Sequence, residues 1–342
     1  MAESVQVPGV RIAAIAASVP SRRVTNDEFA AAIGDEAVRK FERMVGCLER
    51  RHAQNLITHD LALDSATALR EQGAWSTDDV DACIYVGQTY DYAFPATACV
   101  MHGELGLKQG CLTYDVRMGC SAYVCALAQA AALIRSRLCR KVLLVGGDCL
   151  SHVCGKDDSS NRMLFGDAGF ATVVEAAPDD RVMSFRTGTD GSSAKAIYSG
   201  WGGFAKTIGG AAIDDPWLHM DGLNVFKFAS SVVPREMKAF CAGEGCGFDR
   251  YDTFCLHQAN AMILRQIAML AGFPAAKLLW SIERYGNTSP ASIPLTFCAN
   301  AGRSFGQTMM VGFGVGLSWG IAACDMADCL CLPVREVEDG VK

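Results

Sequence analysis

Short runs of β-branched and apolar residues alternate along the chain with longer stretches of helical periodicity. This alternation is typical of an α/β fold, in which helices pack against sheets. The predicted strands are Val10–Ala16, Ala82–Val86, Leu112–Val116, Lys141–Val145, Ala171–Glu175, Thr253–Leu256, Thr308–Gly312 and Leu317–Ala322. The predicted helices are Asp60–Gln72, Ala96–Leu105, Ser121–Arg137, Val225–Phe240, Ala261–Ala271 and Ala291–Ala301.

The helix that begins at Ser121 differs from the others, because its apolar residues surround the helix axis almost completely. An amphipathic surface helix keeps one polar face, whereas a helix that is apolar on all sides is buried. We therefore expect this helix to lie in the middle of the molecule.

The two parts of the chain end in a similar way. Leu164–Glu175 and Val311–Gly320 both contain glycine turns next to a predicted strand. No repeat is exact, so this similarity alone only suggests a duplication. Residues 188–214 are rich in glycine, serine and alanine, and they are expected to form a surface excursion between the parts.

Composition narrows the class of protein. Half of the 342 residues are hydrophobic and a fifth are charged, as in a globular protein with a buried core. The net charge of −6 disfavours nucleic acid as a partner, since nucleic-acid binding requires a basic face. No apolar stretch reaches the roughly 20 residues of a membrane-spanning helix. The N-terminus does not resemble a secretory signal, so we expect a cytoplasmic protein without a membrane partner.

The sixteen cysteines show no disulfide framework and no metal-ligand spacing, so no metal is expected. Most of them lie in apolar runs, where a free cysteine packs as a small hydrophobic residue. The cysteines interpreted as core residues are Cys83, Cys125, Cys139, Cys255, Cys298 and Cys324.

Cys120 is placed differently from the other cysteines. A predicted strand ends before Gly119, and Cys120 opens the buried helix. The N–H groups at the start of a helix carry partial positive charge and favour a thiolate over a thiol. Position alone therefore makes Cys120 a candidate nucleophile. The alternative is that Cys120, like the others, is only a structural residue of the core.

Two further polar positions follow predicted strands or turns. His257 stands at the carboxyl end of a strand, where α/β proteins place ligand sites. Asn287 lies in a polar turn that leads into a helix, and by itself it fits a turn or cap residue. A structural histidine and a structural asparagine are the alternatives.

Several strings, taken together, resemble the β-ketoacyl-ACP synthase III family of the thiolase superfamily. They occur in that family's order and spacing, and they span nearly the whole chain. The strings are Val24-Thr-Asn-Asp-Glu28, Ala93-Phe-Pro95, Gly119-Cys120, Phe165-Gly-Asp-Ala-Gly169, His257-Gln-Ala-Asn260, Gly286-Asn-Thr-Ser-Pro-Ala-Ser-Ile-Pro294 and Gly314-Val-Gly-Leu-Ser-Trp-Gly320.

The resemblance implies a thiolase-like fold with two duplicated halves in a layered αβαβα structure, and a homodimer. The halves would be residues 1–176, carrying Cys120, and residues 177–342, carrying His257 and Asn287. These three residues would form the catalytic triad, and the backbone amides of Cys120 and Val315 the oxyanion hole. Phe94 would reach across the dimer to limit the acyl pocket.

The implied reaction is acyl transfer to Cys120 followed by decarboxylative Claisen condensation with a malonyl thioester. It requires no cofactor, because acyl-coenzyme A or acyl-carrier-protein thioesters are substrates. One alternative is an acyltransferase that uses the same triad to acylate a hydroxyl or amine. Another is a non-catalytic partner subunit.

The chain departs from the family's pattern where coenzyme A is held. Met262 stands where the family has an arginine, and Ser159 where it has another, with Arg162 nearby. The tryptophan and arginine expected around residues 40–46 are both missing from their places, although Arg43 is close. Neither methionine nor serine can replace a guanidinium on a phosphate. We therefore expect a weak or rebuilt coenzyme A clamp, which makes an acyl carrier protein a plausible donor.

Overall fold

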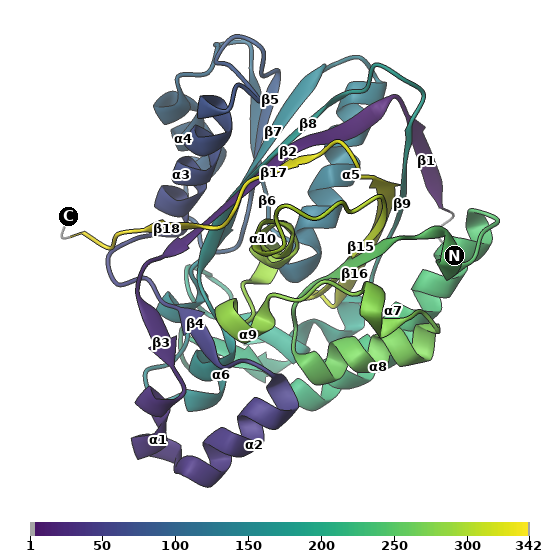
Figure 1. Cartoon of the computed structure of the whole chain (residues 1–342). Coiled ribbons are helices and arrows are strands. Elements are labelled where there is room, and N and C mark those ends of the chain that lie inside the picture. Colours follow the sequence, from purple (N-terminus) through teal and green to yellow (C-terminus); the bar gives the residue numbers. More distant parts are fainter. Residues whose placement is uncertain (1–3, 341–342) are drawn as a thin grey trace.

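The computed structural model describes residues 4–340, which form two sheets with helices between them and on both outer faces (Figure 1). The first sheet has seven strands in the order β17-β2-β8-β7-β5-β6, with β18 also paired to β2. These strands are β2 (Val10–Pro20), β5 (Ala82–Val86), β6 (Leu112–Val116), β7 (Lys141–Asp148), β8 (Ala168–Ala176), β17 (Leu330–Cys331) and β18 (Arg335–Val337).

The second sheet has five strands in the order β1-β9-β16-β15-β14. These strands are β1 (Val5–Pro8), β9 (Val182–Thr189), β14 (Thr253–Leu256), β15 (Gln307–Gly314) and β16 (Ser318–Asp325). The pairing of β14 with β15 is parallel and the other pairings of this sheet are antiparallel.

The helices complete five layers. Helices α3 (Thr58–Glu71) and α4 (Thr97–Leu105) pack on the outer face of the first sheet. Helices α5 (Ala122–Arg135) and α10 (Ser292–Ala299) contact strands of both sheets and lie between them. Helices α7 (Gly222–Gly243) and α8 (Ala261–Ala271) cover the second sheet. The predicted αβαβα layering is confirmed.

Shorter elements connect the layers. They are β3 (Arg23–Thr25), α1 (Asp27–Ile33), α2 (Asp35–Val45), β4 (Glu49–Arg51), α6 (Ser159–Leu164), β10 (Ile197–Ser199), β11 (Thr207–Ile208), β12 (Ala211–Ala212), β13 (Leu218–Met220) and α9 (Ile282–Tyr285). Strands β10 to β13 form two small hairpin-like sheets within the glycine-rich excursion. Within residues 4–340, no helix combines the length and the apolar character that crossing a bilayer requires.

Helix α5 is the central buried helix that the sequence predicts. Its apolar residues meet strands on opposite sides, and Leu127 is completely buried. The helix approaches strand β16 closely at Gly320, where a Cβ atom would lie 2.9 Å from Val124. The absence of a side chain at Gly320 therefore lets α5 pack closely against the second sheet.

Every predicted strand and helix overlaps an element of the structure, but the short elements within residues 23–51, 159–164, 197–220 and 282–285 were not predicted. Strands β5, β6 and β14 and helix α8 match their predicted residues, whereas β1, β9, β17 and β18 were not predicted. Strand β1, at the N-terminal end, pairs in the second sheet, and β17 and β18, at the C-terminal end, pair in the first. Each sheet therefore includes a strand from the opposite end of the chain. The division after residue 176 stays a prediction.

The cysteines are free, and the six that were interpreted as core residues are all buried. That prediction is confirmed. A small thiol side chain suits positions where sheets and helices approach closely.

Leu127→Ala should lower the free energy of unfolding by about 2–5 kcal/mol, because it leaves a cavity beside the central helix. Leu138→Ala is the matched control: Leu138 is 67% exposed, and its removal should change stability by less than about 0.5 kcal/mol. Urea unfolding of the two variants measures the difference. Equal losses would contradict the central position of α5.

Candidate active site

Cys120, His257 and Asn287 line one cavity of about 90 Å³. Cys120 lies in a 3₁₀ turn, Gly119–Ser121, between β6 and α5. His257 directly follows β14, and Asn287 follows α9. The three side chains come from segments far apart in the sequence, and all three are buried. The structure therefore brings together the predicted triad, and Val315 lines the same cavity.

Glycines let the backbone approach the Cys120 sulfur. Gly119 has a φ of +54°, and a Cβ there would lie 2.7 Å from the Val315 side chain. A Cβ on Gly314 would lie 3.1 Å from the Cys120 Sγ. The Ser289 hydroxyl is 3.7 Å from the same sulfur. Only residues without a side chain allow this packing, so both glycines shape the floor of the cavity.

The predicted resting thiolate of Cys120 is wrong. The pKa of the Cys120 thiol is raised to about 12, mainly by burial and to a smaller extent by the charge of Asp148. Hydrogen bonds from Ser289 and from the backbones of Val315 and Cys120 lower the pKa but do not offset burial. The helix start does direct backbone donors at the sulfur, as expected. Loss of water around the thiol outweighs them, so the resting group is neutral.

His257 is also neutral in this site. Burial lowers the pKa of its imidazole to about 3, and a backbone hydrogen bond with Ser289 only partly opposes this shift. The Ser292 Oγ lies 2.7 Å from Nδ1, and the Phe313 ring packs edge-on with centroids 5.4 Å apart. When the Ser292 hydroxyl donates to Nδ1, the imidazole proton is on Nε2. The ring is thereby held as a neutral hydrogen-bond donor.

Asn287 is fixed by its own turn and by the opposite half of the chain. Its Oδ1 accepts a hydrogen bond from the Ser289 backbone N–H at 3.0 Å. Its backbone N–H donates to the Leu164 carbonyl at 2.9 Å, and its carbonyl accepts from Gly166 at 3.0 Å. Because the amide oxygen is engaged, the Nδ2 group is the part of this carboxamide left to donate.

Three polar residues around the triad were not singled out from the sequence. Ser289 and Ser292 lie within the string that carries Asn287, but hydroxyls in such a string are also ordinary turn residues. Asp148 ends strand β7 and accepts hydrogen bonds from the backbone N–H groups of Gln88 and Thr89 at 2.7 and 2.8 Å. Burial raises the pKa of Asp148. Only the folded chain reveals that these groups surround Cys120.

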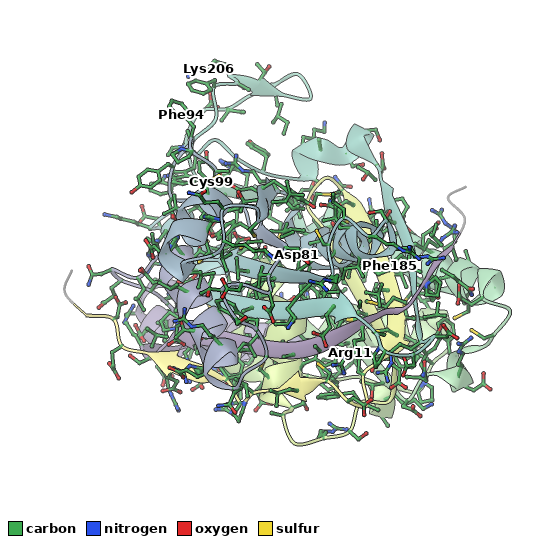
Figure 2. The ribbon with its side chains drawn as sticks, turned by 90° about the horizontal axis from the view of Figure 1, so that it is seen from above. Arg11, Asp81, Phe94, Cys99, Phe185 and Lys206 are labelled. Atoms are coloured by element: carbon green, nitrogen blue, oxygen red, sulfur yellow. The ribbon has the colours of Figure 1, made fainter. Side chains whose placement is uncertain are left out.

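Phe94 lies outside the cavity that contains Cys120. Its side chain is 86% exposed, and Figure 2 shows it projecting at the same end of the molecule as Lys206. A position pointing away from the chain's own site is compatible with a role in a neighbouring subunit. That role stays a prediction.

The residues at the expected coenzyme A positions do not line the cavity that contains Cys120, although Met262 lies next to the lining residue Ile263 in the sequence. Asn260 and Ile263 line it, and Met262 between them is exposed on α8. Arg43 is exposed on α2, and Arg162 reaches the Lys156 carbonyl at 3.4 Å. No guanidinium lines this cavity.

A cysteine at the first turn of a helix enclosed by two sheets, with an imidazole and a carboxamide in the same buried cavity, is suited to holding an acyl thioester away from water. Together with the αβαβα layers, this arrangement defines a condensing enzyme of the thiolase fold.

Comparisons with known proteins identify the family. The model for 3-oxoacyl-[acyl-carrier-protein] synthase III matches residues 114–191, and the model for its C-terminal part matches residues 241–326. The chain is 32% identical over 320 residues to β-ketoacyl-[acyl-carrier-protein] synthase III of Bordetella petrii, covering 90% of this chain and 95% of that protein. The chain thus belongs to the 3-oxoacyl-ACP synthase III family.

Solved structures agree with this assignment. The 3-oxoacyl-(acyl-carrier protein) synthase of Burkholderia xenovorans LB400 superposes with a TM-score of 0.92 at 34% identity, covering 98% of this chain and 99% of that chain. The priming β-ketosynthase of the R1128 polyketide biosynthetic pathway superposes with a TM-score of 0.82 at 26% identity, covering 95% and 96%. The resemblance and the thiolase-like fold expected from the sequence are confirmed.

The alkylation rate of Cys120 by iodoacetamide should rise roughly tenfold per pH unit from pH 7 to pH 9 without a plateau, because its thiol pKa is about 12. Mass spectrometry of the peptide that contains Cys120 measures this rate. In urea, where the chain is unfolded, the same peptide should level off near the ordinary thiol pKa of about 8.5. A plateau below pH 8 in the folded protein would indicate a resting thiolate.

Proposed function

We propose that Cys120 carries the acyl group through the reaction. In the first half-reaction, its sulfur attacks the carbonyl carbon of an acyl thioester. A new carbon–sulfur bond forms to Cys120, the original carbon–sulfur bond breaks, and the thiol proton ends on the departing thiol. The supporting observation is the convergence of Cys120, His257 and Asn287 in one buried cavity.

The tetrahedral intermediate of this step needs donors for its oxyanion. We assign this role to the backbone N–H groups of Cys120 and Val315. The direction of the pKa effects supports the assignment, because both backbones stabilise negative charge at the sulfur. An oxyanion on the carbon attached to that sulfur would form within reach of the same donors.

The second half-reaction is a decarboxylative condensation with a malonyl thioester. The bond to the malonyl carboxylate breaks, carbon dioxide leaves, and the electron pair forms an enolate. His257 Nε2–H and Asn287 Nδ2–H donate to the enolate oxygen. The enolate carbon then attacks acyl-Cys120, so a carbon–carbon bond forms, the carbon–sulfur bond breaks, and Cys120 regains a proton.

The neutral state of His257 fits this role. An imidazole with a pKa of about 3 stays uncharged at pH 7 and donates one hydrogen bond without giving up its proton. It therefore stabilises the enolate without quenching it.

An acyl carrier protein is the donor that the cavity mouth supports best. Met262 and Leu223 are exposed apolar residues that adjoin the lining residues Ile263 and Gly222. Beside Met262 and Leu223, the phosphates of coenzyme A would have no guanidinium to bind. A pantetheine arm needs only a narrow channel, and a carrier protein can make contacts of its own with the surface. Free coenzyme A thioesters would then load more weakly.

The working unit is proposed to be a homodimer in which Phe94 borders the partner's acyl pocket. Its exposure in the single chain supports this role, because Phe94 is free to contact a partner and the nearby Tyr92 is exposed as well. Transfer to a hydroxyl or amine would use the same acyl-Cys120 but release no carbon dioxide from a malonyl thioester.

Incubation with an acyl thioester should add one acyl mass to the wild-type protein and none to Cys120→Ala, because the nucleophilic sulfur is missing. Cys125→Ala is the matched control: Cys125 lies on the same helix, does not line the Cys120 cavity, and its variant should load normally. Intact-mass spectrometry makes the measurement. An equal adduct on Cys120→Ala would remove the covalent mechanism, and no adduct on wild type would favour a non-catalytic subunit.

His257→Ala should slow condensation by roughly 10²–10³-fold, because one donor to the enolate oxygen is lost. Acyl loading should fall by less than about tenfold, since the backbone donors remain. Carbon dioxide release from a malonyl thioester reports condensation, and the mass of acyl-Cys120 reports loading. Equal losses in both steps would contradict this division of roles.

A further inference from the structure

A second chamber of about 240 Å³ adjoins the cavity that contains Cys120. The two cavities share five of their lining residues, so they are adjacent. The shared residues are Gln88, Leu150, Ile197, Leu218 and Val315. All of the shared residues except Gln88 are apolar, so the boundary between the two cavities is suited to contact with an acyl chain.

The second chamber contains a charge that the proposed reaction does not use. Arg117 is the cationic side chain that lines it, and its guanidinium lies 3.6 Å from the centroid of the Tyr90 ring. Within residues 4–340, no acidic side chain forms an ion pair with Arg117. Asp91 instead contacts His59, 2.9 Å away.

The other two nearby acids are satisfied elsewhere. Asp115 accepts hydrogen bonds from the backbone N–H groups of Thr97 and Ala98 at 2.9 and 2.8 Å. Asp148 accepts from backbone N–H groups at 2.7 and 2.8 Å. The guanidinium thus stacks on an aromatic ring while its N–H fork has no anionic partner.

The ring that supports Arg117 is itself held in place. The Tyr90 hydroxyl donates to the Gly202 carbonyl at 3.3 Å, and the Trp201 ring lies 5.0 Å from Tyr90 between centroids. Gly202 has a φ of +68°, and a Cβ there would lie 2.1 Å from the Tyr90 hydroxyl. Stacking fixes the plane of a guanidinium and leaves its in-plane donors available for a planar, bidentate acceptor.

We propose that the acyl group transferred to Cys120 ends in a carboxylate, which Arg117 binds in the second chamber. The substrate class would be the monothioester of a short dicarboxylic acid. This inference rests on the proposed function of Cys120. The acyl chain would be short, because Arg117 and Cys120 are three residues apart: the distance between their Cα atoms, at most about 11 Å, together with the reach of the two side chains limits its length.

The chemistry of such an acyl group matches the side chains that line the second chamber. Its methylenes would lie along Leu150 and Ile197, and its carboxylate would meet the guanidinium of Arg117, which lines the second chamber and is exposed. An acyl chain that ends in a methyl group would place no acceptor beside Arg117. Arg117 is therefore a specificity-determining residue for the loading step.

The test compares loading of Cys120 from pantetheine thioesters in two matched series. Succinyl, glutaryl and adipoyl groups carry the terminal carboxylate, and butyryl, pentanoyl and hexanoyl groups do not. Wild type should load the best dicarboxylic group at least about tenfold faster than its monocarboxylic counterpart, a difference of about 1.4 kcal/mol. The acyl mass on Cys120, followed over time, gives each rate.

Variants of Arg117 separate its charge from its bulk. Arg117→Gln should slow dicarboxylic loading by about tenfold or more while monocarboxylic loading changes less than about threefold, and Arg117→Glu should reverse the preference. Arg117→Lys keeps the charge without the fork and should fall between wild type and Arg117→Gln. Arg303→Gln changes an exposed arginine in the turn that follows α10 and should leave the preference unchanged.

The loading rates test the carboxylate proposal and the proposed function of Cys120 separately. Equal loading of both series by wild type, with a ratio that Arg117→Gln leaves unchanged, would overturn the carboxylate proposal while acyl-Cys120 still forms. No acyl group of either series on wild type would overturn the proposed function as well. Thermal melting of each variant shows whether it is folded, and the mono- to dicarboxylic ratio within one variant cancels any loss of active protein.

Discussion

The burial of the Cys120 sulfur is the constraint on which the rest of the structure depends. The nucleophile sits where a strand of the first sheet turns into a helix that the second sheet also covers. Gly119 and Gly314 have no side chains, so the loop that carries Val315 comes close to the sulfur. The layered fold can thus be understood as the means of enclosing one thiol while leaving backbone donors around it.

Enclosure sets the charge state of the site. The thiol and the imidazole of His257 are both neutral, since burial disfavours each charged form. Charge therefore arises on the reacting groups during the reaction, in a buried site where the effective dielectric constant is low. Donors that are already oriented stabilise such a charge more than water would, because they need no reorganisation.

The sequence predicted the parts of the fold that local pattern determines. Strands Ala82–Val86, Leu112–Val116 and Thr253–Leu256 are short segments rich in β-branched, aromatic and other apolar residues, and they were placed to the residue. Strand β9 was missed because it buries the polar Arg186 and so does not show a simple apolar pattern. Strands β1, β17 and β18 were missed because short terminal strands depend on partners far away in the chain.

The candidate site was predicted in its residues but not in its electrostatics. A strand, a glycine and a buried helix indicated Cys120, and the resemblance linked it to His257 and Asn287. The thiol pKa could not be derived in this way, because the helix start is a local feature whereas burial depends on both sheets. Ser292 was overlooked because its contact with His257 joins two turns 35 residues apart.

The exchange of terminal strands ties the two sheets into one mechanical unit. β1 at the N-terminal end completes the edge of the sheet that carries His257, and the C-terminal β17 and β18 extend the sheet that leads to Cys120. The two sheets could not separate without breaking the backbone hydrogen bonds that pair β1 with β9 and pair β17 and β18 with β2. The nucleophile and its donors are consequently carried by two sheets that the opposite ends of the chain tie together, so the strand pairing resists a hinge motion that would separate them.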